Sequence, residues 1–315
     1  MMPRLSVLLC TRNRGDKIRN AVNSILANTF KDFELLIVDQ STDDKTQSVI
    51  KSYSDSRIRY VRTNTVGLAR ARNIAIRESK TEIVVFTDDD CICDKGWLES
   101  IMAEYSKDHS IMGVYGRVLS YGEKKAGMFC QCIIDSIERK VVNTPIIPYD
   151  ILGHGNNMSF RKEVFRKAGL YIESLGAGTW MKGGEDTDMI YRALRHKIKF
   201  CYSPEPLVYH DNWLTTEQTR KLIYGYTMSG TAIFTKYAVK MDLQALKFIM
   251  MKGRSSLRNF IYHACMGHFD ERIMHELKQL KWFFIGIGIG IYYVFVSYPT
   301  LGENDYVNWQ NKIIL

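Results

Sequence analysis

The sequence predicts an α/β protein with a doubly wound, mainly parallel sheet, followed by a helical C-terminal region. Two observations support this fold class. Short apolar runs alternate with amphipathic helical stretches over roughly the first 120 residues, which is the order that right-handed β-α-β crossovers produce. Three of the four runs are also apolar almost throughout, with only Ser6 and Glu34 as interruptions, as strands are when helices cover both faces of a parallel sheet.

The expected elements follow in chain order. Four runs have the composition of strands: Leu5–Leu9, Phe33–Val38, Ile58–Val61 and Ile83–Phe86. Three stretches between or after them repeat apolar residues at helical spacing: Lys17–Leu26, Asp44–Tyr53 and Ala69–Arg77. The middle third is rich in glycine, which indicates turns and loops. Within it, a helix is expected to begin at Gly184–Asp188 and to run to about Arg195.

From about Thr216 the chain becomes rich in Lys, Arg, Tyr and Met, so we expect two parts, residues 1–215 and 216–315. The segment 282–298 carries no charge; as a helix it would span ~25 Å, slightly less than a hydrocarbon core of ~30 Å. It could be inserted in or re-entrant into a membrane, lie at its surface, or be buried in protein. With the basic flanks, it predicts a membrane-associating extension, in which Gly286 and Gly290 have the spacing that packs helices in lipid.

Composition narrows the classes of function. The 315 residues include 43 Lys and Arg against 34 Asp and Glu, a formal charge of +9, which suits a phosphate-bearing partner or an anionic membrane. A hydrophobic fraction of 46% excludes a mainly disordered chain. The basic residues are scattered rather than arranged in one stripe, so no nucleic-acid partner is expected. Seven cysteines lack the spacing of a structural zinc site.

Polar residues follow three of the predicted strands. In doubly wound sheets, ligands bind beyond the carboxyl ends of the strands. Residues 10–13 follow the first strand, Asp39 and Gln40 the second, and the acidic triplet 88–90 the fourth. Adjacent carboxylates repel each other, so a bound cation or nearby arginines are expected, and carboxylate oxygens suit Mg²⁺ or Mn²⁺. Arg70 and Arg72 lie at a helix start, where they can meet phosphate oxygens.

These residues resemble the family 2 glycosyltransferases, which have the Rossmann-like GT-A fold. The resemblance covers about residues 3–212 and is carried by seven motifs in the family's order. They are Ser6–Arg14, Ile37–Asp43, Gly67–Asn73, Phe86–Cys91, Gly155–Arg161, Leu175–Thr179 and Gly183–Asp188. The resemblance implies an inverting, metal-assisted transferase that uses a nucleotide-sugar donor.

The resemblance also implies roles for the nucleotide-sugar side of the site. Asp39 would recognise the nucleobase, typically uracil, with Thr11 and Arg12 beside it. Arg72, with Asn73 in the same motif, would approach the diphosphate. In the family's Asp-x-Asp, Asp88 would face the ribose and sugar, and Asp90 would hold the metal. Asp89 is the variable middle position and is grouped with the nucleotide-sugar residues.

The second acidic cluster matches the family's catalytic carboxylate. Asp186 would take the proton from an acceptor hydroxyl, with Glu185 as the second candidate; a pKa raised by burial suits a base. Asn157 and Trp180 are expected on the acceptor and sugar side, although Trp180 could instead only pin a loop. His210 ends an apolar run, where it could bind the metal or phosphate or be merely structural.

The expected function is therefore sugar transfer from a UDP-sugar to a hydroxyl of a lipid-linked or polysaccharide acceptor. The basic C-terminal part places it at the cytoplasmic face of a membrane. Two alternatives remain. A sugar nucleotidyltransferase would use a similar carboxylate site but needs a triphosphate-binding loop after the first strand. A nucleotide-sugar-binding scaffold without turnover would bind the donor and not transfer the sugar.

Overall fold

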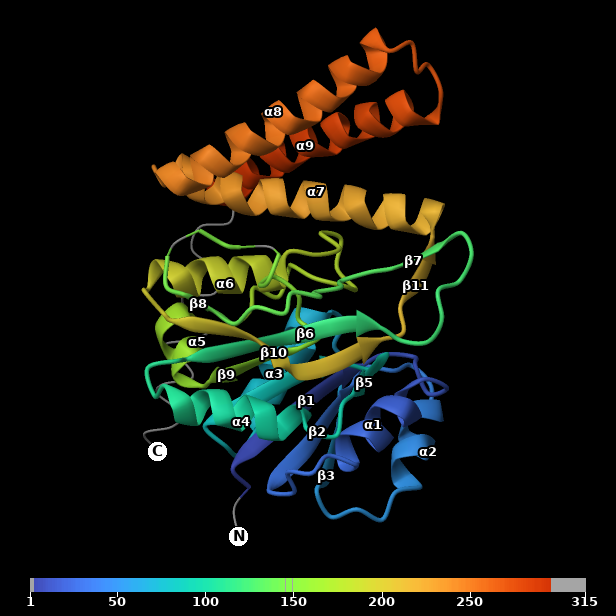
Figure 1. Cartoon of the computed structure of the whole chain (residues 1–315), viewed down its shortest axis with the longest axis vertical. Coiled ribbons are helices and arrows are strands. Elements are labelled where there is room, and N and C mark those ends of the chain that lie inside the picture. Colours follow the sequence, from blue (N-terminus) through green and yellow to red (C-terminus); the bar gives the residue numbers. More distant parts are fainter. Residues whose placement is uncertain (1–2, 145, 149, 296–315) are drawn as a thin grey trace.

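Figure 1 shows a computed structural model of the chain, which describes residues 3–144, 146–148 and 150–295. The predicted α/β architecture is confirmed. A large mixed sheet has helices on both faces, and three long helices form a further layer beyond one end of the sheet (Figure 1).

The first half of the sheet is parallel and has the strand order β3-β2-β1-β4. Its elements agree with the predicted ranges to within a few residues. The strands are β1 (Leu5–Thr11), β2 (Phe33–Asp39), β3 (Ile58–Arg62) and β4 (Ile83–Asp88). The helices between them are α1 (Ile18–Leu26), α2 (Lys45–Lys51) and α3 (Leu68–Glu78).

The second half of the sheet adds antiparallel strands that local sequence patterns did not indicate. β9 (Met158–Arg161) lies antiparallel between β4 and β6 (Gly113–Ser120), and β6 pairs in parallel with β10 (Phe200–His210). β5 (Cys91–Cys93) and β8 (Lys140–Val142) pair antiparallel with β10. β7 (Met128–Cys130) and β11 (Trp213–Thr215) form a separate two-stranded sheet.

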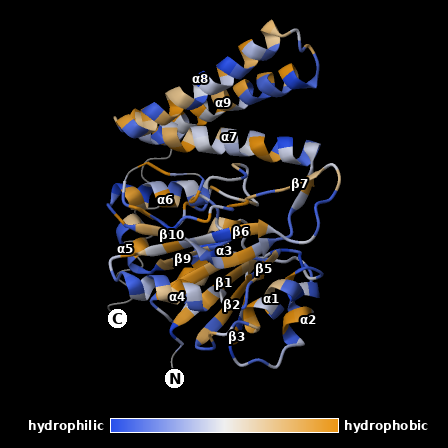
Figure 2. Cartoon of the chain, in the orientation of Figure 1, coloured by the Kyte–Doolittle hydropathy of each residue, from blue (hydrophilic) through white to orange (hydrophobic). Residues whose placement is uncertain are grey.

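Both faces of the sheet are buried, which explains why the parallel strands are mainly apolar. Successive side chains of a strand point to opposite faces, so Leu8 of β1 packs in one core cluster while Val7 and Leu9 pack in the other. The first cluster lies under α3, α5 (Glu163–Ala168) and α6 (Glu185–Arg195), and the second under α1 and α4 (Trp97–Lys107). Hydropathy in Figure 2 follows this division, since the strands between the helical layers are mainly hydrophobic.

The C-terminal layer consists of α7 (Thr216–Val239), α8 (Leu243–Cys265) and α9 (Glu271–Phe295). Thr215 caps α7: its hydroxyl accepts from the Gln218 amide N–H. The layer is fastened to α6 at Asp188, whose buried carboxylate accepts hydrogen bonds from Lys236 and Tyr237 of α7. α7 therefore lies opposite the start of α6, where the predicted catalytic carboxylates stand.

The predicted apolar segment 282–298 falls on the second half of α9, with residues 296–298 outside the described part. Among the described residues, no helix is both long and apolar enough to cross a bilayer. Gly286 and Gly290 pack against α7 within the protein: a Cβ atom on Gly290 would lie 2.5 Å from the Ala232 carbonyl oxygen. Phe283 is buried on the same side, whereas Phe284, Tyr292 and Phe295 are exposed. The segment is therefore only partly buried in protein, and the structure does not support the predicted membrane-associating extension at this segment.

Candidate active site

The register of the sheet brings the predicted strand-end residues to one edge. Thr11 of β1 is paired with Asp39 of β2, and Cys10 is paired with Asp88 of β4. His210, at the end of β10, is paired with Cys91, directly after the acidic triplet. Residues separated by up to 200 positions in the chain thus meet because their strands end at the same edge.

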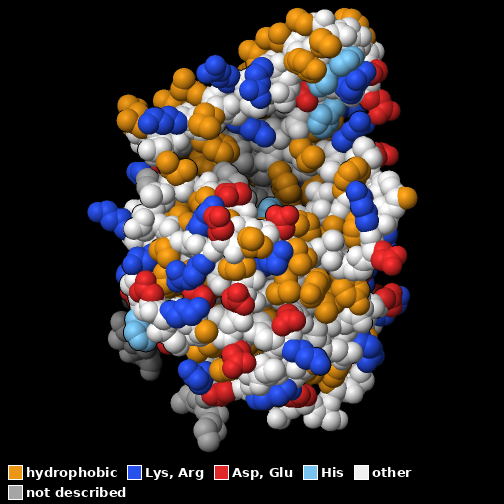
Figure 3. All heavy atoms as spheres, viewed as in Figure 1, with side chains coloured by type: hydrophobic (Ala, Val, Ile, Leu, Met, Phe, Trp, Pro, Cys, Tyr) orange, Lys and Arg blue, Asp and Glu red, His pale blue; other side chains and the backbone are white. Residues whose placement is uncertain are grey.

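A cavity of about 750 Å³ opens at this edge, between the sheet and the C-terminal helices. Figure 3 shows the molecule hollowed below the helical layer. Most of the predicted site residues line this cavity. They are Thr11, Arg12, Arg72, Asp88, Asp89, Asp90, Glu185, Asp186 and His210.

The three adjacent carboxylates have different surroundings. Burial raises the pKa of Asp88, although the charge of Arg72 opposes the shift. Burial also raises the pKa of Asp89 to about 7, despite a 2.7 Å hydrogen bond donated by the Thr11 hydroxyl. Asp90 behaves differently: burial would raise its pKa, but the hydrogen bond and charge of His210 and the charge of Arg14 lower it. Asp90 is therefore the member of the triplet held most firmly as an anion.

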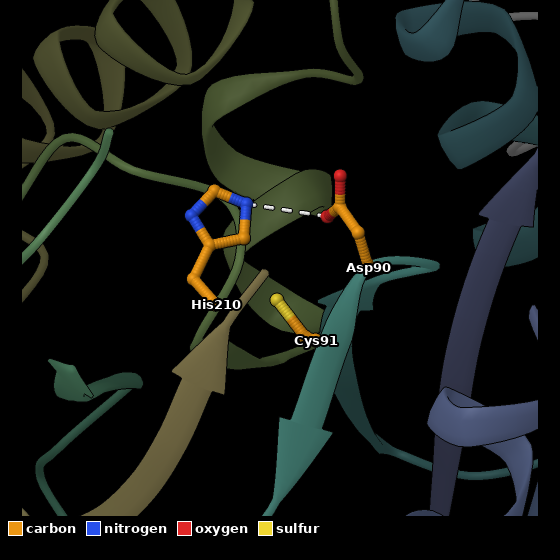
Figure 4. Close-up of side chains that lie close together, drawn as sticks. All are labelled: Asp90, Cys91 and His210. Carbon is orange, nitrogen blue, oxygen red and sulfur yellow. Dashed lines mark ion pairs between the residues drawn. The ribbon is translucent and has the colours of Figure 1, made fainter. Parts of the chain in front are cut away.

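Asp90 and His210 form the best candidate for a metal site (Figure 4). The Nε2 atom of His210 lies 3.2 Å from a carboxylate oxygen of Asp90, and the Cys91 thiol is close to both. Nδ1 of His210 lies 2.8 Å from the Gln131 carbonyl oxygen, to which only a protonated Nδ1 can donate. The lone pair of Nε2 in neutral His210 then faces the carboxylate, so a proton or a cation is needed between them.

The chemistry of these donors fits Mn²⁺ or Mg²⁺. A carboxylate suits both ions, and an imidazole suits the softer Mn²⁺ better. Burial and the neighbouring carboxylates raise the pKa of Cys91 well above its usual value, so the thiol stays protonated and is a poor ligand. Asp90 and His210 would hold the ion, and they leave the remaining positions to water and a substrate phosphate.

Arg72 joins the two acidic clusters. Its guanidinium is almost completely buried and lies 2.5 Å from Asp186, 3.7 Å from Glu185 and 3.7 Å from Asp88. Gly155 leaves the room for this arrangement, because a Cβ atom there would lie 2.1 Å from an Arg72 nitrogen and 2.6 Å from an Asp186 oxygen. One buried cation thus balances part of the negative charge of three carboxylates.

The pKa of Asp186 is shifted toward neutrality. Burial raises its pKa to about 7, with a further increase from Glu185 and Asp88, while the charge of Arg72 lowers it. Glu185 also has a raised pKa because of burial. A base is most effective when its pKa lies near the working pH. Asp188, two residues on, is different, since Lys236 and Arg192 outweigh its burial and lower its pKa to about 2.

Four predicted site residues do not line the cavity. Asp39 is fully buried and accepts hydrogen bonds from the Ser41 amide and the Tyr60 hydroxyl, while its neighbour Gln40 reaches the cavity. The Asn73 side-chain amide donates a hydrogen bond to the Tyr171 carbonyl oxygen and accepts one from the Tyr171 backbone N–H.

Asn157 and Trp180 lie beside the cavity rather than on it. The Asn157 amide accepts from the Trp97 indole N–H and donates to the carbonyls of Arg117 and Pro206, so its polar atoms are engaged within the protein. Trp180 stacks on Tyr293 of α9 with ring centres 6.1 Å apart, which is the loop-pinning arrangement.

The cavity also contains residues that sequence reasoning did not assign. Arg14 pairs with Asp89 and Asp90; it is the last residue of the Ser6–Arg14 motif, so the motif indicated it. Asn156, the neighbour of the predicted Asn157, has a buried side-chain oxygen with no hydrogen-bond partner among the described residues. Tyr226 and Lys252, from α7 and α8, also line the wall. No motif in the sequence around these two residues indicated a site, since only tertiary packing brings α7 and α8 over the sheet.

Comparisons with known proteins identify a family and several relatives. The family model described as "Glycosyl transferase family 2" matches residues 6–169, more than half of the chain. A pre-mycofactocin glycosyltransferase of Mycobacterium tuberculosis is 23% identical over 241 residues, which cover 73% of this chain and 47% of that protein. The poly(ribitol-phosphate) β-N-acetylglucosaminyltransferase TarP of Staphylococcus aureus is 33% identical over 123 residues, 36% of this chain and 37% of TarP. The chain thus spans about half or less of the length of these relatives.

Two solved structures share the fold. A mannosyltransferase of Pyrobaculum calidifontis, solved with GDP-Man and Mn²⁺, has a TM-score of 0.58 at 15% identity and covers 93% of this chain and 88% of its own. Staphylococcus aureus TarS, solved with UDP-GlcNAc, has a TM-score of 0.56 at 16% identity, with 92% and 91% covered. At these identities the likeness concerns the fold, and it agrees with the expected GT-A architecture.

Proposed function

Because the chain belongs to the family 2 glycosyltransferases, we propose that it transfers a sugar from a nucleotide-sugar donor to an acceptor hydroxyl, with inversion at the anomeric carbon. One observation carries this proposal. A single cavity contains a candidate metal pair, Asp90 and His210, a buried arginine, Arg72, and a carboxylate with the pKa of a base, Asp186.

The donor would occupy the sheet side of the cavity. Thr11, Arg12 and Gln40 line this side, beyond the ends of β1 and β2, and the buried Asp39 would hold the loop that meets the base. We propose UDP as the nucleotide on the resemblance of the Asp39 motif. Bound at Asp90 and His210, Mn²⁺ or Mg²⁺ would neutralise the charge that develops on the leaving diphosphate.

Asp186 and Arg72 would have different roles in the reaction. Asp186 takes the proton from the acceptor hydroxyl as its oxygen forms the new bond to the anomeric carbon. The bond from that carbon to the diphosphate oxygen breaks, and the nucleoside diphosphate leaves with the electron pair. Arg72 is placed to stabilise the leaving anion, since its guanidinium already faces Asp88 as well as Asp186. Attack opposite the leaving group gives inversion.

The acceptor would enter from the side of α7 and α8. This wall combines apolar and polar groups with two lysines, Lys182 and Lys252, that form no ion pair with described residues. Cations beside an apolar wall suit an amphiphilic acceptor that carries phosphate. We therefore propose a lipid-linked or polysaccharide acceptor, as in polysaccharide biosynthesis, used at the cytoplasmic face of a membrane.

Product analysis tests this function against its alternatives. The purified protein is incubated with a panel of nucleotide sugars, with Mn²⁺ or with a chelator, and the released nucleotide is measured. Metal-dependent release of a nucleoside diphosphate supports the proposal. Release of pyrophosphate from a nucleoside triphosphate and a sugar phosphate would identify a nucleotidyltransferase. Donor binding without transfer or hydrolysis would identify a scaffold.

A further inference from the structure

We propose that the outward face of α8 is a docking surface for an anionic lipid membrane. The inference concerns a surface on the far side of α8 from the cavity and does not depend on the reaction. It rests on the charge of α8, on the position of its apolar side chains, and on its place in the fold.

The charge of α8 has one sign. Between Leu243 and Cys265 the helix contains four Lys and Arg residues and no Asp or Glu. Three of them, Lys247, Arg254 and Arg258, are exposed and follow each other at intervals of seven and four, which places them on one side of the helix. None of the three forms an ion pair within the described part of the chain. Their positive charge is therefore available to an external anion.

Beside these cations runs an apolar stripe that faces solvent. It consists of Leu243, Leu246, Met250, Leu257 and Ile261, each between 44% and 66% exposed. Their spacing of three, four and seven residues puts them on one face. The buried residues of α8, Ala245 and Ser256, lie on the opposite face, toward the rest of the protein. A helix of a soluble protein normally turns its apolar stripe inward, so this outward stripe indicates a partner.

The place of α8 in the fold suits a membrane. α8 lies in the layer farthest from the N-terminus (Figure 1), and Figure 3 shows hydrophobic and basic side chains along that end of the molecule, with histidines and acidic side chains at one side of it. Phe248 and Lys252, on the other side of the same helix, line the cavity. A membrane that holds α8 would therefore lie next to the wall where the acceptor is proposed to enter.

The chemistry of the surface favours lipid over a second copy of the chain. Exposed Leu, Met and Ile bordered by Lys and Arg match an interface of acyl chains and anionic headgroups. Two copies that met through this face would bring three cations of each chain together, and like charges in contact repel. The membrane contact inferred here lies on α8 and not in the segment 282–298.

Flotation with lipid vesicles tests the inference on the full chain. The vesicles are phosphatidylcholine alone or phosphatidylcholine with phosphatidylglycerol. We expect binding to the anionic vesicles that weakens as salt increases. Each Lys or Arg near such a surface contributes about fivefold in affinity, so Lys247→Gln, Arg254→Gln and Arg258→Gln together should weaken binding on the order of 100-fold.

Matched variants separate this surface from general charge and hydrophobicity. Neutralising Lys31, Lys51 and Lys95, which are exposed on the catalytic part, should leave binding within about twofold if the effect is local. The apolar variant Leu243→Ser, Met250→Ser, Leu257→Ser should abolish flotation.

Three results would overturn the proposal. The wild type could stay unbound with both vesicle types, or the Lys31, Lys51 and Lys95 variant could lose as much affinity as the α8 variant. The third result would be a wild-type dimer, detected by sedimentation and disrupted by the apolar variant, together with no binding of the wild type to vesicles. Thermal unfolding of each variant verifies that it is folded.

Discussion

Replacing Arg72 by methionine should destabilise the protein in a way that depends on pH. Arg72→Met retains an apolar stem and removes the guanidinium that pairs with Asp186 at 2.5 Å and faces Asp88 and Glu185 at 3.7 Å. Breaking a buried ion pair on one side typically costs about 3–5 kcal/mol, since the remaining charge stays buried. For a chain of this size we expect a fall in Tm on the order of 10 °C near pH 8.

The pH dependence follows from the raised pKa of Asp186. The folded-state value of about 7 lies above the ordinary 3.8, so between these values the folded state binds more protons than the unfolded state. Stability from this group is therefore lost as the pH rises toward 7. Without Arg72 the pKa rises further, because the charge that lowers it is gone. The penalty should consequently be smaller at pH 6, where the folded carboxyl is protonated with or without Arg72.

A second arginine provides the matched control. Arg166 pairs with Glu82 at 2.8 Å, but both side chains are exposed, so Arg166→Met should change stability by at most about 1 kcal/mol at either pH. Thermal unfolding at pH 6 and pH 8 measures both variants. A decrease in Tm for Arg72→Met that matches the control, or that is equal at the two pH values, would refute the argument from buried charge.

Further predictions concern catalysis, metal binding and packing. Asp186→Asn should lower sugar transfer by about 10²–10⁴-fold with donor binding retained, and the wild-type kcat/KM should rise with pH through about 7 as this carboxyl ionises; a flat profile would exclude it as the base. Asp90→Ala should raise the Mn²⁺ concentration needed for activity at least about tenfold. Adding Mn²⁺ stepwise to enzyme from which metal has been removed with a chelator would measure this, and an unchanged requirement would place the metal elsewhere. Gly155→Ala should abolish transfer, because its Cβ would displace the ion pair of Arg72 and Asp186; activity within about twofold of wild type would contradict this. Gly290→Ala should lower stability by about 1–3 kcal/mol through its clash with α7, whereas Gly288→Ala, with open space around it, should not destabilise; equal melting temperatures would contradict this packing.

The parallel half of the sheet was predictable from sequence because its strands are buried on both faces. Runs such as Phe33–Val38, in which Glu34 is the only polar residue, leave little choice of structure when helical patterns alternate with them. The edge at which Thr11, Asp88 and His210 meet followed from topology, since ligand sites lie beyond the carboxyl ends of strands. The antiparallel strand β9 was not predicted, because its four residues are too few to show a period.

The limits of sequence reasoning appear where tertiary contacts decide. The choice of Asn157 over Asn156 concerned neighbouring amides, and only the structure shows that Asn157 is bonded to Trp97 while the oxygen of Asn156 has no partner among described residues. The glycines of α9 have a spacing that serves packing in lipid or in protein, and here Gly290 serves contact with α7. Neighbouring asparagines and glycines four residues apart have the same local sequence pattern whichever contacts they make, so only the structure distinguishes the alternatives.

Co-crystals with Mn²⁺ and a nucleoside diphosphate test the central claim most directly. The nucleotide is the one that most raises the melting temperature in a screen, since a ligand of the folded state stabilises it. Anomalous scattering should place one Mn²⁺ within about 2.3 Å of an Asp90 oxygen and of a diphosphate oxygen, with His210 Nε2 as a further ligand. An Mn²⁺ peak away from Asp90 and His210, or a nucleotide bound outside this cavity, would contradict the account.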